Sequence, residues 1–328
     1  WTNDVTVFKK RSCVSIMTGA PCPRGTEAVV EKEAVEEGPG RVLLPAEVRP
    51  GRNIAPRGCE AAAGALLLRP LDRIGPRAVA VLASVGRTAV RAIPRPAVAV
   101  GATGGELVDA ADDPGPGRIR DSNGPMLAAF ARGEGAGEVV TDRCADTEGA
   151  LAAALARHRG AAALVLSGGV SAGRYDLVPD AVRAAGGEVL FHKVDQKPGM
   201  PMLFARRGAQ AVFALPGNPV SAHFCFHRYV APFLRVLRGL SPASAVREGS
   251  LEAPARNRGR RPWFVPVRVR AAGGDPASWR VLPVPGAGSA DLFGTAGADA
   301  YARLAPGADL PAGARVPFEL SGCCRWMD

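Results

Sequence analysis

The chain has 328 residues, enough for two or three domains, and its 47% hydrophobic and 22% charged residues are typical of a globular protein. No apolar run approaches the roughly 18 residues that a membrane span needs, and the first residues lack the apolar core of a signal peptide, so no membrane partner is expected. The net charge of +10 comes mostly from arginine, and the aromatic residues, 5% of the chain, are not interleaved with its most basic stretch, residues 255–261. Because a base-stacking surface needs such aromatics, no nucleic-acid partner is expected.

Two scarce residue types bear on location and chemistry. The seven cysteines are odd in number and irregularly spaced, which argues against a disulfide framework and for a reducing, cytoplasmic location. Lysine occurs only at positions 9, 10, 32, 193 and 197. Its two late occurrences therefore stand out among the many arginines.

Three regions follow one another along the chain. Residues 1–93 carry short apolar runs between Gly and Pro, which predicts a β-rich region with few helices, a helix at 77–86 and a start truncated within a strand. Residues 94–242 alternate strand and helix patterns, which predicts an α/β domain with a mainly parallel central sheet flanked by helices. Residues 245–322 return to a β pattern, which predicts a small β-barrel or sandwich.

The central region has the clearest pattern of elements. Strands are predicted at 96–106, 137–143, 161–169, 188–194 and from 211 until Pro216 stops it, and helices at 122–133, 146–160 and 178–187. A long helix follows the last strand and is expected to kink at Pro232. Its predicted buried face consists of Ala222, Phe226, Val230, Phe233 and Leu237.

A glycine-rich loop follows the strand pattern in residues 164–176, "LVLSGGVSAGRYD". Bare glycine backbone lets amide N–H groups approach an anion with no Cβ atoms in the way. Ser171 adds a hydroxyl donor, and Asp176 can hold a divalent cation against a phosphate or order a water. The loop alone is equally compatible with a plain glycine-rich turn.

Lys193 and Lys197 stand four residues apart, directly before a Pro-Gly turn. In an extended or turning segment their two ammonium groups can converge on one oxyanion. The alternative interpretation is a solvated charge pair. The rarity of lysine elsewhere in the chain favours a functional role.

Two further patterns have weaker chemical meaning. A predicted helix start carries Asp121, Ser122 and Asn123. Helix starts bind anions through their free N–H groups and the helix dipole. Simple N-capping is the alternative, and it explains Ser122 or Asn123 alone. His223 and His227 have metal-ligand spacing on one helix face. Because no Glu accompanies them and their neighbours are apolar, no metal is expected there.

Together these segments resemble the molybdopterin molybdenumtransferase family. The matching stretches run in family order over nearly the whole chain: "IMTGAPCPRGTEAVV", "ATGGELVD", "IRDSN", "SGGVSAGRYD", "KVDQKPGMP", "LPGNPVSA" and "GSADLFGTAGADAYARLAPG". The resemblance implies an enzyme of molybdenum cofactor biosynthesis that uses Mg²⁺, inserts molybdate into adenylylated molybdopterin and releases AMP. It also implies an elongated homodimer, a contact with the molybdopterin adenylyltransferase, and an active site on the central domain that the C-terminal domain and the partner subunit close.

The resemblance implies roles for the residues that match the family's motifs. Asp176, Lys193, Lys197 and Thr18 are implied as catalytic groups, with the lysines attracting molybdate and the phosphates. Asp176 and Glu106 are implied as metal ligands. The residues implied to bind the pterin, its phosphates and the nucleotide are Gly168, Gly169, Ser171, Gly173, Asp121, Ser122, Asn123, Pro216, Gly217, Asn218, Ser221 and Ser289.

The sequence also departs from the family pattern. The replaced positions are Gly105 for the aspartate of "TGDEL", Cys59 for an acidic residue, Met200 for a lysine and Pro266 for an arginine. The N-terminal "DGYA" motif is absent, in keeping with the expected truncation. Losing a carboxylate weakens a metal site, and Glu106 or Asp109 are candidates to substitute. The alternative function is therefore that of a catalytically weakened relative, which binds molybdopterin as a carrier or scaffold. A third candidate function is that of the adenylyltransferase of the same pathway. It fits poorly, because adenylyltransferases lack the flanking β regions that this chain has.

Overall fold

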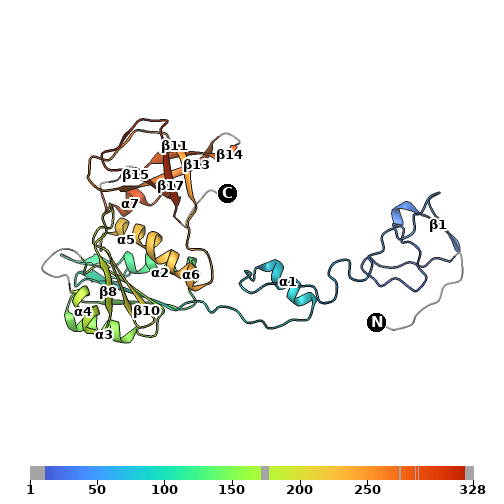
Figure 1. Ribbon diagram of the computed structural model, residues 1–328, viewed down its shortest axis with the longest axis horizontal. Helices are drawn as coiled ribbons and strands as arrows, with labels where there is room; N and C mark the ends of the chain where they lie inside the picture. The colour runs from blue at the N-terminus through green and yellow to red at the C-terminus, as the bar shows by residue number, and fades with distance from the viewer. Residues whose placement is uncertain (1–11, 171–176, 273–274, 285, 287, 322–328) are drawn as a thin grey trace. The chain divides into compact units, whose positions relative to one another are not determined.

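The computed structural model describes residues 12–170, 177–272, 275–284, 286 and 288–321, and the chain divides into two compact units, Trp1–Val90 and Arg91–Asp328 (Figure 1). In its described part, the first unit contains a 3-10 helix (Lys32–Ala34), the antiparallel strands β1 (Glu36–Gly38) and β2 (Arg41–Leu43), and helix α1 (Pro76–Ser84). The prediction of a helix at 77–86 is confirmed. Gly and Pro interrupt the other apolar runs, which limits strand pairing in this unit.

A six-stranded sheet lies at the centre of the second unit, in the order β6-β3-β7-β10-β9-β8. The strands are β3 (Val98–Thr103), β6 (Val139–Cys144), β7 (Ala163–Ser167), β8 (Glu188–His192), β9 (Leu203–Arg207) and β10 (Gln210–Leu215). The first four strands in this order are parallel, whereas β9 is antiparallel to both of its neighbours. The prediction of a mainly parallel sheet is confirmed. The sequence pattern missed β9, which brings the carboxyl end of β8 to the same edge as those of β7 and β10.

Helices cover both faces of this sheet. On one face lie α2 (Asn123–Gly133), α5 (Pro219–Cys225), a π-helical segment (Phe226–Val230) and α6 (Ala231–Leu237), and on the other lie α3 (Glu148–Arg157) and α4 (Val178–Ala184). Leu127 and Phe226 are buried on the first face, and Leu151 and Val182 on the second. Each such side chain stabilises the fold by about 1.5–3 kcal/mol. Figure 1 shows α3 and α4 on the side of the sheet away from the C-terminal strands.

The long helix of the central region is interrupted by its π-helical segment. The Ala231 N–H donates to the carbonyl of Phe226, one residue further back than in an α-helix. Pro232 follows directly, and because proline has no N–H and crowds the preceding turn, a wider turn accommodates it. The extra residue rotates the later side chains about the helix axis, so Leu234 is fully buried while Leu237 is 36% exposed. The prediction that Leu237 lies on the buried face is therefore wrong.

The C-terminal strands form a closed barrel in the order β11-β14-β13-β15-β17, which confirms the predicted small β-barrel. These strands are β11 (Val246–Leu251), β13 (Trp263–Ala272), β14 (Asp275–Pro283), β15 (Ala300–Leu304) and β17 (Arg315–Leu320). Phe224 of α5 packs against Phe264 and Tyr301 of the barrel, with ring centroids 4.7 Å and 5.0 Å apart. The barrel and the α/β layers thus share an aromatic contact. Among the described residues, no helix combines the length and the apolar character needed to cross a membrane.

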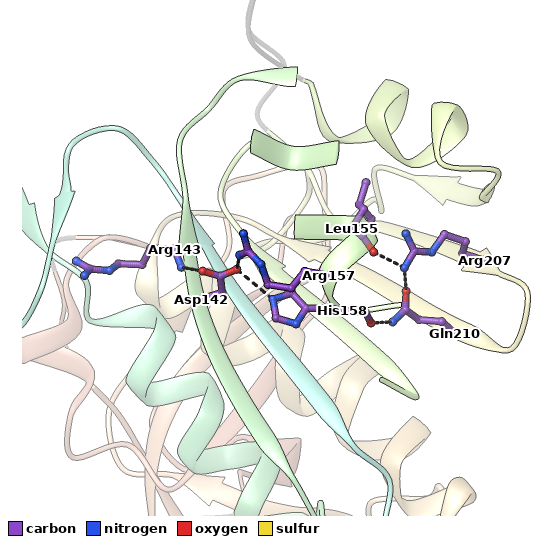
Figure 2. Close-up of polar contacts among 7 residues, drawn as sticks. All are labelled: Asp142, Arg143, Leu155, Arg157, His158, Arg207 and Gln210. Atoms are coloured by element: carbon purple, nitrogen blue, oxygen red, sulfur yellow. Dashed lines mark hydrogen bonds and ion pairs between the residues drawn. The ribbon is translucent and has the colours of Figure 1, made fainter. Parts of the chain in front are cut away.

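A buried polar network fastens α3 to the sheet (Figure 2). Arg207 Nη2 donates to the carbonyl of Leu155 and to Gln210 Oε1, each at 2.6 Å. Gln210 Nε2 donates in turn to the carbonyl of His158 at 2.6 Å. Arg207 is only 7% exposed, and the network gives hydrogen-bond partners to its Nη2 group, while its Nε atom has none among the described residues.

The neighbouring Asp142 predicts a pH-dependent contribution to stability. Burial raises the pKa of the Asp142 carboxyl, but the hydrogen bond from His158 and the charge and hydrogen bond of Arg157 more than offset this, so the pKa lies below its ordinary value of 3.8. A lowered pKa stabilises the fold above pH 3.8 and loses that effect as the pH falls further. We expect Asp142→Asn to lower the free energy of unfolding by about 1–2 kcal/mol at pH 7, and by much less near pH 3. Denaturant unfolding at both pH values measures this, with Glu188→Gln, which removes an exposed ion pair, as a control that changes little. An equal loss at both pH values would contradict the assignment.

Candidate functional site

Three neighbouring strands, β3, β7 and β10, end at one edge of the sheet. Ser167, the last residue of β7, lies in register with Ala102 and Leu215 of the strands on either side. Thr103 Oγ1 donates to the Ser167 carbonyl at 3.2 Å, and the Gly168 N–H donates to the Leu215 carbonyl at 3.0 Å. These bonds hold the three strand ends together and fix where their loops begin.

Gly168 and Gly169 begin the glycine-rich loop, with φ angles of +101° and +69°. A Cβ atom at Gly168 would lie 2.6 Å from the carbonyl oxygen of Thr103, and one at Gly169 would lie 2.9 Å from Val178 Cγ2. Both the left-handed backbone and the close neighbours therefore require glycine. The result is bare backbone at the tip of a parallel strand, where ligands of such sheets bind.

Asn123, the first residue of α2, reaches across these strand ends. Its side chain is 9% exposed, and Nδ2 donates to Ser167 Oγ at 2.8 Å and to the Gly217 carbonyl at 2.7 Å. Because a carbonyl only accepts hydrogen bonds, the contact with Gly217 fixes the orientation of the amide. Asn123 Oδ1 is then buried without a hydrogen-bond partner among the described residues. A buried acceptor left in this state costs about 1–3 kcal/mol, so it is suited to receive a donor from a ligand.

The start of α2 is held against the loop that follows β3. Ser122 occupies the N-cap position, as the sequence predicts, but its side chain makes no capping bond. Asp121 Oδ1 instead accepts the Gly124 N–H at 2.8 Å. The short parallel pair β4 (Leu107–Val108) and β5 (Ile119–Arg120) brings Asp121 to this position, with its N–H donating to the Val108 carbonyl at 2.9 Å. The predicted segment Asp121–Asn123 thus lies at the strand ends.

Two carboxylates lie at the same edge. The Glu106 carboxylate folds over Gly104, where an added Cβ atom would meet it at 2.8 Å. Burial raises the pKa of the Asp146 carboxyl, the Glu106 carboxylate raises it further, and a hydrogen bond with Thr103 opposes both. Thr147 caps α3, and Asp146 is a residue at this edge that the sequence patterns did not predict for the site. Its position directly after β6 is the signal that could have identified it.

The loop after β10 connects the site to the barrel region. Asn218 Nδ2 donates to Ser289 Oγ at 2.8 Å, and the Val220 N–H donates to the Ser289 carbonyl at 3.1 Å. Two residues far apart in the sequence, both predicted in the site, are therefore in contact. Pro216 is buried and Ser221 is 4% exposed, so these two residues shape the loop from within rather than face solvent.

The lysine-bearing segment follows β8 at the same edge of the sheet. The Lys193 N–H donates to the Met202 carbonyl at 2.8 Å, and Lys193 has a φ of +72°. The side chains of Lys193 and Lys197 are both exposed. Because neighbouring strands lie about 4.8 Å apart, β8 lies about 10 Å from β10, a distance that a nucleotide-sized ligand can span.

The remaining predicted residues lie in the other unit or outside the described residues. Thr18 lies in an exposed turn of the first unit. Ser171, Gly173 and Asp176 lie outside the described residues. Their roles stay predictions.

The histidine pair of α5 and the π-helical segment lies among aromatic rings. His223 Nδ1 contacts Tyr301 Oη, and both imidazoles make edge-to-face contacts with Phe130, at centroid distances of 4.9 Å and 4.6 Å. Burial lowers the pKa of His223 to about 4 and that of His227 to about 3, the latter with further contributions from the His223 and Arg235 charges. Both rings are therefore neutral at physiological pH and serve the contact between α2, this helix and the barrel.

Comparison with known proteins gives consistent results along the chain. Residues 2–86 match a family described as "MoeA N-terminal region (domain I and II)", and residues 99–236 match one described as "Probable molybdopterin binding domain". The chain is 38% identical over 279 residues to Molybdopterin molybdenumtransferase 2 of Mycobacterium tuberculosis, covering 80% of this chain and 68% of that one. It is 36% identical to Molybdopterin molybdenumtransferase of Staphylococcus epidermidis, covering 70% of this chain and 55% of that one.

A solved structure agrees with these sequence relatives. The molybdopterin biosynthesis MoeA protein from Pyrococcus horikoshii superposes with a TM-score of 0.74 at 27% identity, covering 91% of this chain and 73% of that one. The chain belongs to the molybdopterin molybdenumtransferase family.

Proposed function

We propose that this chain inserts molybdate into adenylylated molybdopterin and releases AMP and the finished molybdenum cofactor. One observation carries the proposal: three joined strand ends present bare glycine backbone beside Asn123 Oδ1, a buried acceptor with no partner among the described residues. Backbone amides and a helix start attract phosphates, and the acceptor suits an N–H group of a pterin or adenine ring. The curated relatives named as molybdenumtransferases support this chemistry.

The proposed mechanism relies on positioning and electrostatics. Lys193 and Lys197 gather the doubly charged oxyanion next to the dithiolene of the pterin, and the glycine backbone holds the phosphates. Fixed charges and dipoles in such a site stabilise developing negative charge without reorganising during the reaction. Hydrolysis of the AMP linkage then makes insertion effectively irreversible.

We place Mg²⁺ at Glu106 and Asp146, with Asp176 as a further ligand that the sequence motif supplies. The raised pKa of Asp146 reflects burial and repulsion between two oxygen ligands of like charge, which a divalent cation neutralises. No group of three or more His, Cys, Asp or Glu side chains gathers among the described residues. Glu106, Asp146 and Asp176 would therefore share the cation with waters, several of which Mg²⁺ usually keeps. A cation held by these carboxylates would supply Lewis-acid polarisation of the phosphoanhydride.

The alternative function is a carrier that binds molybdopterin without turnover, and Gly105 is the residue that suggests it. It replaces the family's usual aspartate, but Asp146 provides a carboxylate at the same strand edge. The names of the curated relatives do not favour the carrier. Release of AMP from adenylylated molybdopterin, measured with and without molybdate, tests the proposal. Molybdate-dependent AMP release is expected, and tight binding of the nucleotide substrate with no AMP release would overturn it.

Gly105→Asp is expected to reduce the Mg²⁺ concentration needed for half-maximal AMP release by about tenfold, because it adds a carboxylate beside Glu106. The substitution is sterically permitted, since a Cβ atom at Gly105 meets nothing within 4 Å. Gly160→Asp, at an equally open position after α3, is the matched control and should leave the Mg²⁺ dependence unchanged. Equal Mg²⁺ dependence in all three proteins would place Gly105 outside the metal site.

Family resemblance further supports a homodimer, a contact with the molybdopterin adenylyltransferase, a cytoplasmic location and a division into residues 1–93, 94–242 and 245–322. Light scattering on the purified chain tests the first of these. A particle of twice the chain mass is expected, and a monomer at micromolar concentration would contradict it.

A further inference from the structure

The backbone of Lys197 is joined to the start of a barrel strand. The Lys197 N–H donates to the Pro262 carbonyl at 2.9 Å, and the Phe264 N–H donates to the Lys197 carbonyl at 2.7 Å. Lys197 and Trp263 therefore form a parallel bridge. Backbone hydrogen bonds thus join the lysine-bearing segment, which follows β8, to the start of β13.

The two side chains at this bridge also interact. Lys197 Nζ lies 4.4 Å from the centroid of the Trp263 ring, within the range of a cation–π contact. The Trp263 ring packs against the hydrophobic core of the barrel, while Lys197 remains exposed. The ring is thus fixed by the barrel, and the ammonium group above it stays accessible to a ligand.

We propose that Trp263 is a positioning residue for the oxyanion: it holds the Lys197 ammonium group at the site through its aromatic face. This inference rests on the proposed role of Lys197 in binding molybdate. A lysine has a flexible four-carbon stem, so an anion must normally order that stem when it binds. A stem already ordered by the ring removes that cost, and the anion meets a pre-placed charge. The barrel then contributes to the affinity for molybdate without touching it.

Lys193 is the natural comparison within the same segment. It is exposed and its backbone is fixed by the hydrogen bond to Met202. Among the described residues, the cation–π contacts involve Lys197, Arg228 and Arg247, and Lys193 has none. Trp263 should therefore act through Lys197 and not through Lys193.

A mutant cycle on the full chain tests this, with molybdate binding measured by calorimetry. Trp263→Leu is expected to raise the Kd for molybdate about fivefold to thirtyfold, and Trp263→Phe, which keeps an aromatic face, to raise it less. In a Lys197→Met background, Trp263→Leu should not weaken molybdate binding any further. In a Lys193→Met background, it should weaken molybdate binding as much as it does in the otherwise unchanged chain. As a readout independent of binding, Lys197→Met should shift the emission of Trp263, isolated by subtracting the spectrum of Trp263→Phe.

The outcomes separate this inference from the function beneath it. If Lys197→Met leaves molybdate binding unchanged, the proposed role of Lys197 fails. If Lys197→Met weakens binding but Trp263→Leu does not, or if Trp263→Leu is equally harmful in both lysine backgrounds, Trp263 is not a positioning residue and the proposed function stands.

Discussion

Replacing Gly168 by alanine is expected to lower the free energy of unfolding by about 2–5 kcal/mol and to abolish binding of adenylylated molybdopterin. The added Cβ atom would lie 2.6 Å from both the carbonyl oxygen and Oγ1 of Thr103. The carbonyl belongs to the end of β3 and cannot rotate away as a flexible side chain can. The φ of +101° adds backbone strain for any residue with a Cβ atom. The ends of β3, β7 and β10 must therefore move apart, and the binding site that they form loses its geometry.

Denaturant unfolding and nucleotide binding measure this result, and two glycines provide controls. Gly208→Ala, in the β9–β10 hairpin, keeps a positive φ of +60° but meets nothing within 4 Å, so it should cost only about 1 kcal/mol. Gly217→Ala lies in the site but its nearest contact is an ordinary 3.7 Å, so it should hardly affect stability. If Gly168→Ala unfolds no more easily than Gly208→Ala, the close approach to Thr103 does not exist in solution.

The part of the site that could be predicted follows from one rule of topology. Parallel strands end at a common edge, so the segments after each strand meet there whatever their separation in the sequence. This edge is where the structure brings together Asn123 and the lysine-bearing segment, which only the family resemblance had assigned to one site, although 70 residues separate Asn123 from Lys193. Strand and helix periodicity predicted the sheet itself, and the resemblance supplied the residues of the site.

The rest depends on pairings that local patterns do not encode. β9 is short and carries Arg207, whose side chain is buried and finds its partners on α3 and on the neighbouring strand β10. Periodicity misplaces Leu237 because a single extra residue in the π-helical segment shifts every later side chain. The contact between Lys197 and Trp263 joins two parts of the chain whose patterns are independent. Such features arise from tertiary packing, so they could only be seen in the folded structure.

Gly199→Ala is the second substitution with a large expected effect. Gly199 has a φ of +86°, and an added Cβ atom would lie 2.3 Å from Cys225 Sγ and 3.1 Å from Gln196 Nε2. The Cys225 thiol is fully buried, burial raises its pKa, and it donates to the Gly199 carbonyl at 3.7 Å. We expect a loss of about 3–5 kcal/mol in the free energy of unfolding, together with weaker molybdate binding, because the displaced turn carries Lys197.

Removing the sulfur atom separates the steric effect from the backbone effect. Cys225→Ala alone should lower the free energy of unfolding by about 1–2 kcal/mol. In the double variant with Gly199→Ala and Cys225→Ala, the total loss should be about 1–3 kcal/mol smaller than the sum of the two single losses. The reason is that the space left by Sγ receives the new methyl group. Gly186→Ala, with a φ of +78° and nothing within 4 Å, isolates the backbone strain that remains. Partial recovery of molybdate affinity in the double variant would tie the position of Lys197 to the packing of this turn on α5. Strictly additive losses would show instead that the turn does not rest on Cys225, and the structural support proposed for Lys197 would then have to come from the barrel alone.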